Sequence, residues 1–277
     1  MYQLDHHVLA SGINARWPEY RGETLRWLHE GEHFVLAVLG ETRVVRIPRS
    51  DADRWRLRRE VALLGQLQGT VAWPLPRYDD VRQGWGRYRY LVGTPLPKAS
   101  SLPAGLGQEL QAFLGWLHHQ PVAQPNLARR QWARRYRALV SRLEPQVMPL
   151  LTVRDRRQSQ RRLMEGLDLL EHRAWEPTLI HGNLAPRHVL VAGENWALAG
   201  IVDFSQWRIG DAALDWSGIE GLEAFLPGRL ADDECFRARL RFYQFLRPFE
   251  GILRALKHGR VEAAERHVQW VRRQLSQ

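Results

Sequence analysis

The chain has 277 residues, of which 44% are hydrophobic and 25% are charged. This is the composition of a folded globular protein, not of a disordered one, and the length suits one large domain or two lobes. The formal net charge is +10, carried almost entirely by arginine, because Lys98 and Lys257 are the two lysines. We expect most arginines on solvent-exposed helix faces. Nucleic-acid binding is a weak alternative, since no zinc-finger spacing or RNA-binding motif supports it.

The sequence carries no pattern typical of secretion or membrane insertion. Residues 1–7 lack the basic segment followed by an apolar one that a signal peptide needs, and no apolar run reaches about 18 residues. Cys235 is the single cysteine, so no disulfide framework is expected and a reducing compartment fits. We therefore expect a cytoplasmic protein that does not bind a membrane.

The first clear secondary-structure pattern is a β-hairpin. Residues 33–39 and 42–47 are rich in β-branched and apolar side chains and flank Gly40 and Glu41, which predict a two-residue turn. Pro48 is expected to end the second strand, because proline offers no N–H to a strand partner. Residues 1–30 have no clear pattern.

A helix follows this hairpin, and the pattern changes again near residue 93. Ser50 is expected to cap a helix that runs through Leu67, with Asp53 in a capping-box position. Residues 88–92 predict another strand. Beyond Gly93, proline and glycine cluster and helical spacing replaces strand alternation, so we place a boundary between a sheet-rich part, 1–93, and a mainly helical part, 94–277.

Polar residues gather at strand ends between residues 179 and 204. Leu179 and Ile180 form a short predicted strand that leads into the polar sequence His-Gly-Asn, and residues 189–192 and 198–202 form a second hairpin. Asn183, His188 and Asp203 would then surround one point. Polar groups collected on loops beside β-structure usually form a ligand site.

These elements, in this order, resemble the aminoglycoside phosphotransferase family of small-molecule kinases. The resemblance covers roughly residues 25 to 275. It rests on a hairpin, the Val-Arg-Ile-Pro-Arg strand, a helix with a glutamate, a Leu-Val-Gly connector, the His-Gly-Asn loop, the Ile-Val-Asp-Phe strand end, Gly-Asp and Leu-Asp. It implies an α+β, two-lobed protein-kinase-like fold with a small N-terminal antiparallel sheet lobe and a larger helical C-terminal lobe.

The resemblance also implies roles for individual residues. ATP, or another nucleoside triphosphate, would bind in a cleft between the lobes, with Arg46 gripping phosphates and Glu60 orienting it. Leu91 and Val92 would offer backbone groups to the base, and Asp203 would hold Mg²⁺ or Mn²⁺. The acceptor would be a hydroxyl of a small molecule bound in the helical lobe. His181, Asp211 and Asp215 would be structural.

The catalytic loop departs from the family pattern at two positions. Asn183 stands where the family has the aspartate that accepts the hydroxyl proton, and His188 stands where it has a metal-binding asparagine. An amide is a very poor base, and imidazole prefers softer metals than Mg²⁺. Two interpretations stay open. Either the protein is a slow phosphotransferase, with His188 taking the proton or holding Mn²⁺, or it is a pseudokinase that binds nucleotide or a small ligand without turnover.

Overall fold

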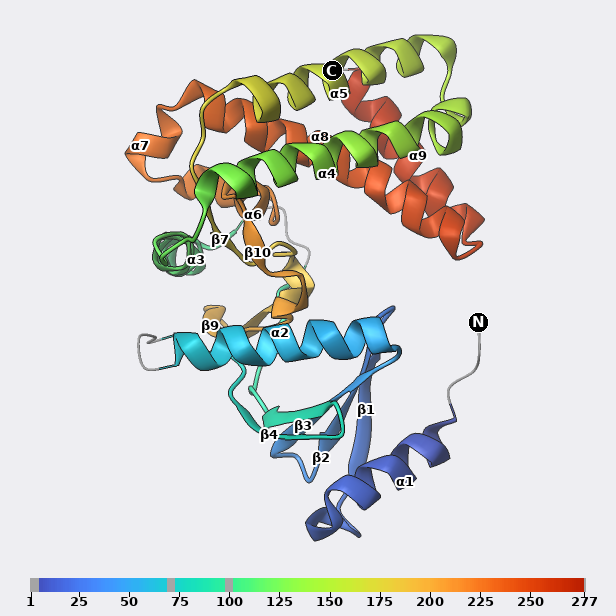
Figure 1. Ribbon diagram of the computed structural model, residues 1–277, viewed down its shortest axis with the longest axis vertical. Helices are drawn as coiled ribbons and strands as arrows, with labels where there is room; N and C mark the ends of the chain where they lie inside the picture. Colours follow the sequence, from blue (N-terminus) through green and yellow to red (C-terminus); the bar gives the residue numbers. More distant parts are fainter. Residues whose placement is uncertain (1–4, 69–72, 98–101, 277) are drawn as a thin grey trace. The chain divides into compact units, whose positions relative to one another are not determined.

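The computed structural model describes residues 5–68, 73–97 and 102–276, and it divides into two compact units. The first unit comprises Met1–Lys98 and Pro186–Gln206, and the second comprises Ala99–Ala185 and Trp207–Gln277 (Figure 1). The hairpin after the His-Gly-Asn loop therefore belongs with the N-terminal sheet, whereas the expected boundary at residue 93 assigned it to the helical part. Among the described residues, no helix has the length and apolar character needed to cross a bilayer.

The first unit is built on a five-stranded antiparallel sheet with the strand order β1-β2-β3-β5-β4. Its strands are β1 (Leu25–Glu30), β2 (Phe34–Leu39), β3 (Arg43–Pro48), β4 (Tyr78–Arg82) and β5 (Trp85–Arg89). The predicted hairpin is confirmed as β2 and β3, but Leu39 pairs with Arg43, so the turn has three residues and not two.

The strand predicted over residues 88–92 is wrong in position, because β5 occupies Trp85–Arg89. A tight turn at Gln83 and Gly84, both with positive φ, connects β4 to β5, and this hairpin sets the strand three residues earlier. Leu91 and Val92 consequently follow the strand as connecting chain.

Helices cover both faces of the sheet. Ile13 and Trp17, at the end of α1 (His6–Arg16) and just after it, belong to one buried cluster with alternate residues of β2 and β3. Successive strand residues point to opposite faces. Arg46 therefore lies on the other face, the face covered by α2 (Asp51–Leu67), seen as the long cyan helix in Figure 1.

The start of α2 agrees with the predicted cap. The Ser50 hydroxyl accepts the Asp53 backbone N–H at 3.2 Å and donates to the Asp53 carboxylate at 2.6 Å. These contacts satisfy a backbone donor that the first helical turn leaves without a partner. The helix then places Glu60, three turns along, against the sheet.

A second small sheet in the first unit holds the hairpin of β8 (Val189–Ala192) and β9 (Ala197–Ile201), joined by β6 (Thr94–Pro95). Val189 pairs with Ile201, and the His188 carbonyl accepts the Val202 N–H at 2.9 Å. The residues that flank this hairpin, His188 and Asp203, are thereby brought to the same end.

The second unit is mainly helical. Its longer helices are α3 (Ala104–His118), α4 (Pro125–Gln146), α5 (Val153–His172), α8 (Glu234–Lys257) and α9 (Val261–Leu275), with short α6 (Ala213–Trp216) and α7 (Gly228–Ala231). β7 (Pro177–Ile180) pairs with β10 (Arg208–Asp211) as an antiparallel ribbon. An interior network links Trp132, Tyr243, Asp211 and Arg239, in which the Trp132 indole donates to Tyr243 at 2.8 Å and Tyr243 donates to Asp211 at 3.0 Å.

Candidate functional site

Arg46 is the centre of a buried ionic cluster in the first unit. Only 3% of this residue is exposed, and its Nη2 donates to Asp203 Oδ1 and lies 3.4 Å from Glu60 Oε2. Burial alone would lower the pKa of Arg46, but Glu60 and Asp203 together raise it well above its ordinary value. The guanidinium therefore stays charged. We call Arg46, Glu60, His188 and Asp203 the Arg46 cluster.

Glu60 is the most deeply buried carboxylate of the Arg46 cluster. Burial raises the pKa of Glu60 from 4.5 to about 7, although Arg46 opposes the shift. Near neutral pH this glutamate can therefore gain or lose a proton inside the folded chain. Arg46 and Glu60 form the predicted ion pair. The role of this pair in orienting Arg46 for a nucleotide stays a prediction.

Asp203 is held in an unusual backbone conformation and is surrounded by donors. Its φ is 66°, in the left-handed region that L-residues with a side chain seldom adopt, and such positions cluster at functional sites. Burial would raise the pKa of Asp203, but Arg46 and His188, with the Ser205 hydroxyl, lower it well below its ordinary value. Asp203 is therefore a carboxylate at any working pH. A quarter of its side chain is exposed, more than of any other side chain in the Arg46 cluster.

His188 and Asp203 lie together because the hairpin of β8 and β9 brings their backbones opposite each other. The His188 Nε2 atom is 3.2 Å from Asp203 Oδ2, and the histidine is almost wholly buried. The structure thus brings together His188 and Asp203, two of the three residues that the sequence places around one point, while Asn183 lies in the second unit. Whether the pair binds a metal stays a prediction.

Two further residues of the cluster were missed from the sequence. The Phe34 ring lies under the Arg46 guanidinium, 4.0 Å from centroid to carbon, and the Ser205 hydroxyl donates to Asp203 Oδ1 at 2.8 Å. Phe34 could have been found, because the predicted hairpin places it two residues from Leu36, the strand partner of Arg46. Ser205 carries a weaker signal, its position two residues after the aspartate.

The His-Gly-Asn loop belongs to the second unit. The buried Asp215 carboxylate accepts the backbone N–H groups of His181 at 2.8 Å and Gly182 at 2.9 Å, and it also contacts His118 Nε2 at 3.1 Å. The His181 ring accepts the Asn183 N–H at 3.3 Å. His181 and Asp215 are therefore structural residues of the loop, as expected, and they fix the backbone that carries Asn183.

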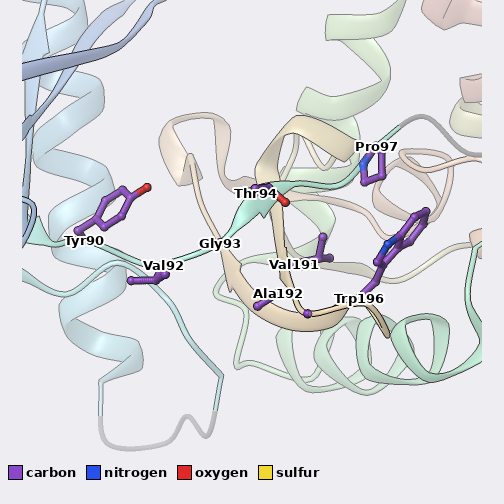
Figure 2. A pocket seen from close by; sticks show the side chains of 9 residues that line it. Tyr90, Val92, Gly93, Thr94, Pro97, Val191, Ala192 and Trp196 are labelled. Atoms are coloured by element: carbon purple, nitrogen blue, oxygen red, sulfur yellow. The ribbon is translucent and has the colours of Figure 1, made fainter.

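A cavity of about 350 Å³ lies beside the connector of the first unit (Figure 2). Side chains of the connector and of the turn between β8 and β9 line it, among them Tyr90, Val92, Thr94 and Trp196. Val92 is thus one wall of a cavity, while Leu91 and the members of the Arg46 cluster do not line it. The binding of a base by Leu91 and Val92 stays a prediction.

The chain matches one family of known proteins over most of its length. The family described as "Phosphotransferase enzyme family" matches residues 14–249. The structure of the GDP and kanamycin complex of APH(2")-IIia is 21% identical with a TM-score of 0.82, covering 97% of this chain and 98% of that chain. Macrolide 2'-phosphotransferase type I is 20% identical with a TM-score of 0.68, covering 98% of this chain and 99% of that one.

A third solved structure, macrolide 2'-phosphotransferase MphH from Brachybacterium faecium, is 18% identical with a TM-score of 0.62, covering 95% of this chain and 97% of that chain. No curated protein sequence matches the chain. At these identities the solved structures show the fold, and they confirm the predicted α+β, kinase-like architecture.

Proposed function

Because the chain belongs to the phosphotransferase enzyme family, we propose that it binds a nucleoside triphosphate at the Arg46 cluster and transfers a phosphoryl group slowly to a hydroxyl of a small molecule. The observation that carries this proposal is Arg46, a permanent cation held between Glu60 and Asp203 inside a sheet-rich unit. A phosphotransferase works mainly by positioning phosphates and stabilising their charge. A rigid guanidinium is suited to both tasks because its fork binds oxygens in pairs.

ATP and GTP are both candidates for the nucleotide. The similar structure of APH(2")-IIia is a complex with GDP, and that of aminoglycoside phosphotransferase APH(2'')-Ib is ADP-bound, so the likeness favours neither purine. In this chain the base would lie along the connector at Leu91 and Val92, which follow the end of β5 at Arg89. The connector's role is part of the proposal.

The divalent cation expected from the resemblance fits this donor set poorly. Asp203 Oδ1 already accepts Arg46 and Ser205, and Asp203 Oδ2 faces the imidazole of His188. Across the residues that the structure describes, no group of three His, Cys, Asp or Glu side chains is placed to hold a metal ion.

Slow transfer follows from Asn183. The loop that carries it is firmly held by Asp215, so the loop's frame is intact while its proton acceptor is replaced by an amide. A general base typically contributes about 10²–10⁴-fold to a rate. The loose transition state of phosphoryl transfer lets the reaction proceed without such a base, at a correspondingly lower rate.

A pseudokinase is the second candidate function. The observation that favours it is the pair of replacements Asn183 and His188, combined with His188 occupying an oxygen of Asp203. Such a protein would bind nucleotide as strongly as the proposed enzyme and would turn over none of it. Nucleic-acid binding has no comparable support.

The acceptor is expected to be neutral or acidic. An aminoglycoside is a polycation and needs carboxylates, whereas this chain has a net charge of +10. Of the carboxylates between residues 220 and 234 that could meet an amine, Asp233 is committed to capping α8, where it accepts the Phe236 N–H at 2.9 Å. Acceptors without multiple amines should therefore be screened first.

The binding half of the proposal is tested by thermal denaturation with ATP and with GTP. A ligand present at about 100 times its Kd raises the free energy of unfolding by about 2.7 kcal/mol, a shift that is easily seen. A melting temperature that stays flat at millimolar concentrations of both nucleotides would contradict nucleotide binding.

The Asn183→Asp variant tests the catalytic half. Restoring a carboxylate should raise the nucleotide hydrolysis or transfer rate by about 10-fold or more, toward the contribution typical of a general base. Turnover is measured as release of nucleoside diphosphate in the wild type and the variant. If the wild type and the variant both bind nucleotide but neither releases diphosphate, the pseudokinase is the correct candidate.

A further inference from the structure

We propose that nucleoside-triphosphate binding at the Arg46 cluster does not require a divalent cation, because Arg46 and His188 occupy the Asp203 oxygens that such a cation would use. This inference rests on the proposed function, and it deepens that proposal by assigning the Asp203 oxygens that a metal would use to two side chains of the chain itself.

The hydrogen-bonding capacity of Asp203 is nearly used up inside the protein. A carboxylate has roughly four acceptor positions on its two oxygens. Oδ1 accepts the Arg46 Nη2–H and the Ser205 hydroxyl, the latter at 2.8 Å, and Oδ2 lies 3.2 Å from His188 Nε2. About one of the four positions is left. A cation that bound Asp203 in the usual way would have to displace one of these donors.

The proton in the contact between His188 and Asp203 belongs to the histidine. An ionised carboxylate can only accept, so a hydrogen bond across this 3.2 Å contact requires the hydrogen on Nε2. A ring nitrogen that carries hydrogen has no lone pair left for a metal. His188 in this geometry is therefore a donor to Asp203, and its Nε2 does not act as a second metal ligand.

The hairpin makes this arrangement rigid. The His188 carbonyl accepts the Val202 N–H at 2.9 Å, one residue before Asp203, so the two side chains leave adjacent points of a paired ladder. On the opposite side, Arg46 is sandwiched between the Phe34 ring at 4.0 Å and the carboxylates of Glu60 and Asp203. Arg46 lies within β3, and His188 directly precedes β8, so the backbone of each donor is fixed by strand pairing.

Mg²⁺ in nucleotide sites is usually held by one or two carboxylates together with phosphate oxygens, and it cancels the repulsion between them. In this chain the single positive charge of Arg46 is shared between the Asp203 and Glu60 carboxylates, and His188 lies against the second oxygen of Asp203. A cation that bridged Asp203 and the phosphates would have to compete with both side chains for its protein ligand. Nucleotide binding without the cation avoids that competition.

The experiment is isothermal titration of the wild-type chain with GTP and with ATP, once with excess Mg²⁺ and once with a chelator. We expect the two Kd values for the preferred nucleotide to agree within about threefold, a difference well below the 1.4 kcal/mol of a tenfold change. Binding that appears with Mg²⁺ and weakens more than about tenfold with chelator would overturn the inference while leaving the proposed function intact. No binding under either condition would overturn both.

The His188→Asn variant tests whether His188 is the side chain that keeps a cation from Asp203 Oδ2. An amide leaves Asp203 Oδ2 open and adds an oxygen ligand beside it, so the variant should acquire metal dependence. Its nucleotide affinity is expected to fall about tenfold in chelator, the loss typical of a hydrogen bond to a charged group, and to recover with Mg²⁺. Equal affinity of this variant with and without Mg²⁺ would contradict the role of His188.

His172→Asn is the matched control, because it makes the same change at a histidine on α5 whose side chain is 69% exposed. This control should match the wild type in both buffers. Circular dichroism establishes that each variant is folded before titration. If His188→Asn does not fold, the comparison of chelator and Mg²⁺ in the wild-type chain decides the inference alone.

Discussion

Two aspartates, one in each unit, are stabilised as carboxylates by different kinds of hydrogen-bond donor. Asp203 in the first unit is balanced by the side-chain donors Arg46, His188 and Ser205, and a quarter of it reaches the surface. Asp215 in the second unit is fully buried and accepts two backbone N–H groups and His118. In both cases burial would raise the pKa of the aspartate, and the donors lower it below its ordinary value.

The two kinds of donor distinguish Asp215, which holds a loop in place, from Asp203, which can meet a ligand. Backbone donors fix the position of the chain, so Asp215 serves the conformation of the His-Gly-Asn loop. The donors to Asp203 are side chains, and the backbone of Asp203 itself adopts a strained conformation with a φ of 66°. Removing donors or acceptors on each side should therefore damage stability and nucleotide binding in different proportions.

The largest effect is expected from Arg46→Ala. The change leaves Glu60 and Asp203 buried without their cation, which costs about 3–5 kcal/mol of unfolding free energy for a buried pair. Nucleotide binding should be lost as well. Urea denaturation measures the first effect and isothermal titration the second.

Arg43→Ala is the control for Arg46→Ala, because Arg43 lies on the same strand and pairs with Asp79 at the surface. Surface pairs contribute about 0–1 kcal/mol, so this variant should be nearly as stable as the wild type and should bind nucleotide equally well. Equal losses in the two variants would contradict a special role for Arg46.

Asp215→Ala is expected to cost about 2–3 kcal/mol, because it leaves the His181 and Gly182 N–H groups buried without an acceptor. Nucleotide affinity should stay within about threefold of the wild type, while the loop that carries Asn183 loses its order. The same pair of measurements applies, with Asp168→Ala on the exposed face of α5 as the control. A loss of nucleotide binding as large as in Arg46→Ala would erase the distinction between the two aspartates.

Glu60→Gln should change how stability depends on pH. Since burial raises the pKa of Glu60 from 4.5 to about 7, the folded chain binds a proton that the unfolded chain has released. This contribution to stability is complete below about pH 4.5 and is lost as pH rises through about 7. The variant should lack that decline, a difference of about 2–3 kcal/mol between pH 5 and 8.

Urea denaturation at several pH values measures this decline, and Glu165→Gln is the control, because Glu165 is exposed on α5. Glu165→Gln should follow the wild type at every pH. Parallel curves for the wild type and Glu60→Gln would show that Glu60 does not titrate in this range.

Ser205→Ala is expected to have the smallest effect. It removes one hydroxyl donor to Asp203 and leaves Arg46 and His188 in place, so stability should fall by about 1 kcal/mol. Ser276→Ala, near the end of the chain, should change stability by less than about 0.5 kcal/mol. If Ser205→Ala lowered the free energy of unfolding as much as Arg46→Ala, hydrogen bonding and not ion pairing would be what stabilises the Asp203 carboxylate.

Elements with strong local signals were predictable from the sequence. The hairpin of β2 and β3, the cap of α2 and the hairpin of β8 and β9 follow from β-branched runs, turn residues and a Ser-to-Asp spacing. Elements that depend on a distant partner were not. β1 is mostly exposed and pairs only through β2, and β10 exists by pairing with β7, which lies nearly thirty residues earlier. A window of local sequence contains neither partner.

The Arg46 cluster could be predicted from the order of the motifs along the chain, but not from any local sequence pattern. Arg46 and Asp203 are 157 positions apart, so no periodicity relates them, and the resemblance to small-molecule kinases supplied their proximity. The contact of His188 with Asp203 could be read from the hairpin, because residues that flank a paired ladder lie opposite each other. What the sequence could not indicate is that His188 faces Asp203 as a donor.

The central claim, nucleotide binding at the Arg46 cluster, is tested most directly by isothermal titration of the wild-type chain with ATP and with GTP beside folded Arg46→Ala and Arg43→Ala variants. We predict saturable binding of one nucleotide by the wild type and by Arg43→Ala, and none by Arg46→Ala. Absence of saturable binding by the wild type, or equal binding by the folded Arg46→Ala variant, would contradict it.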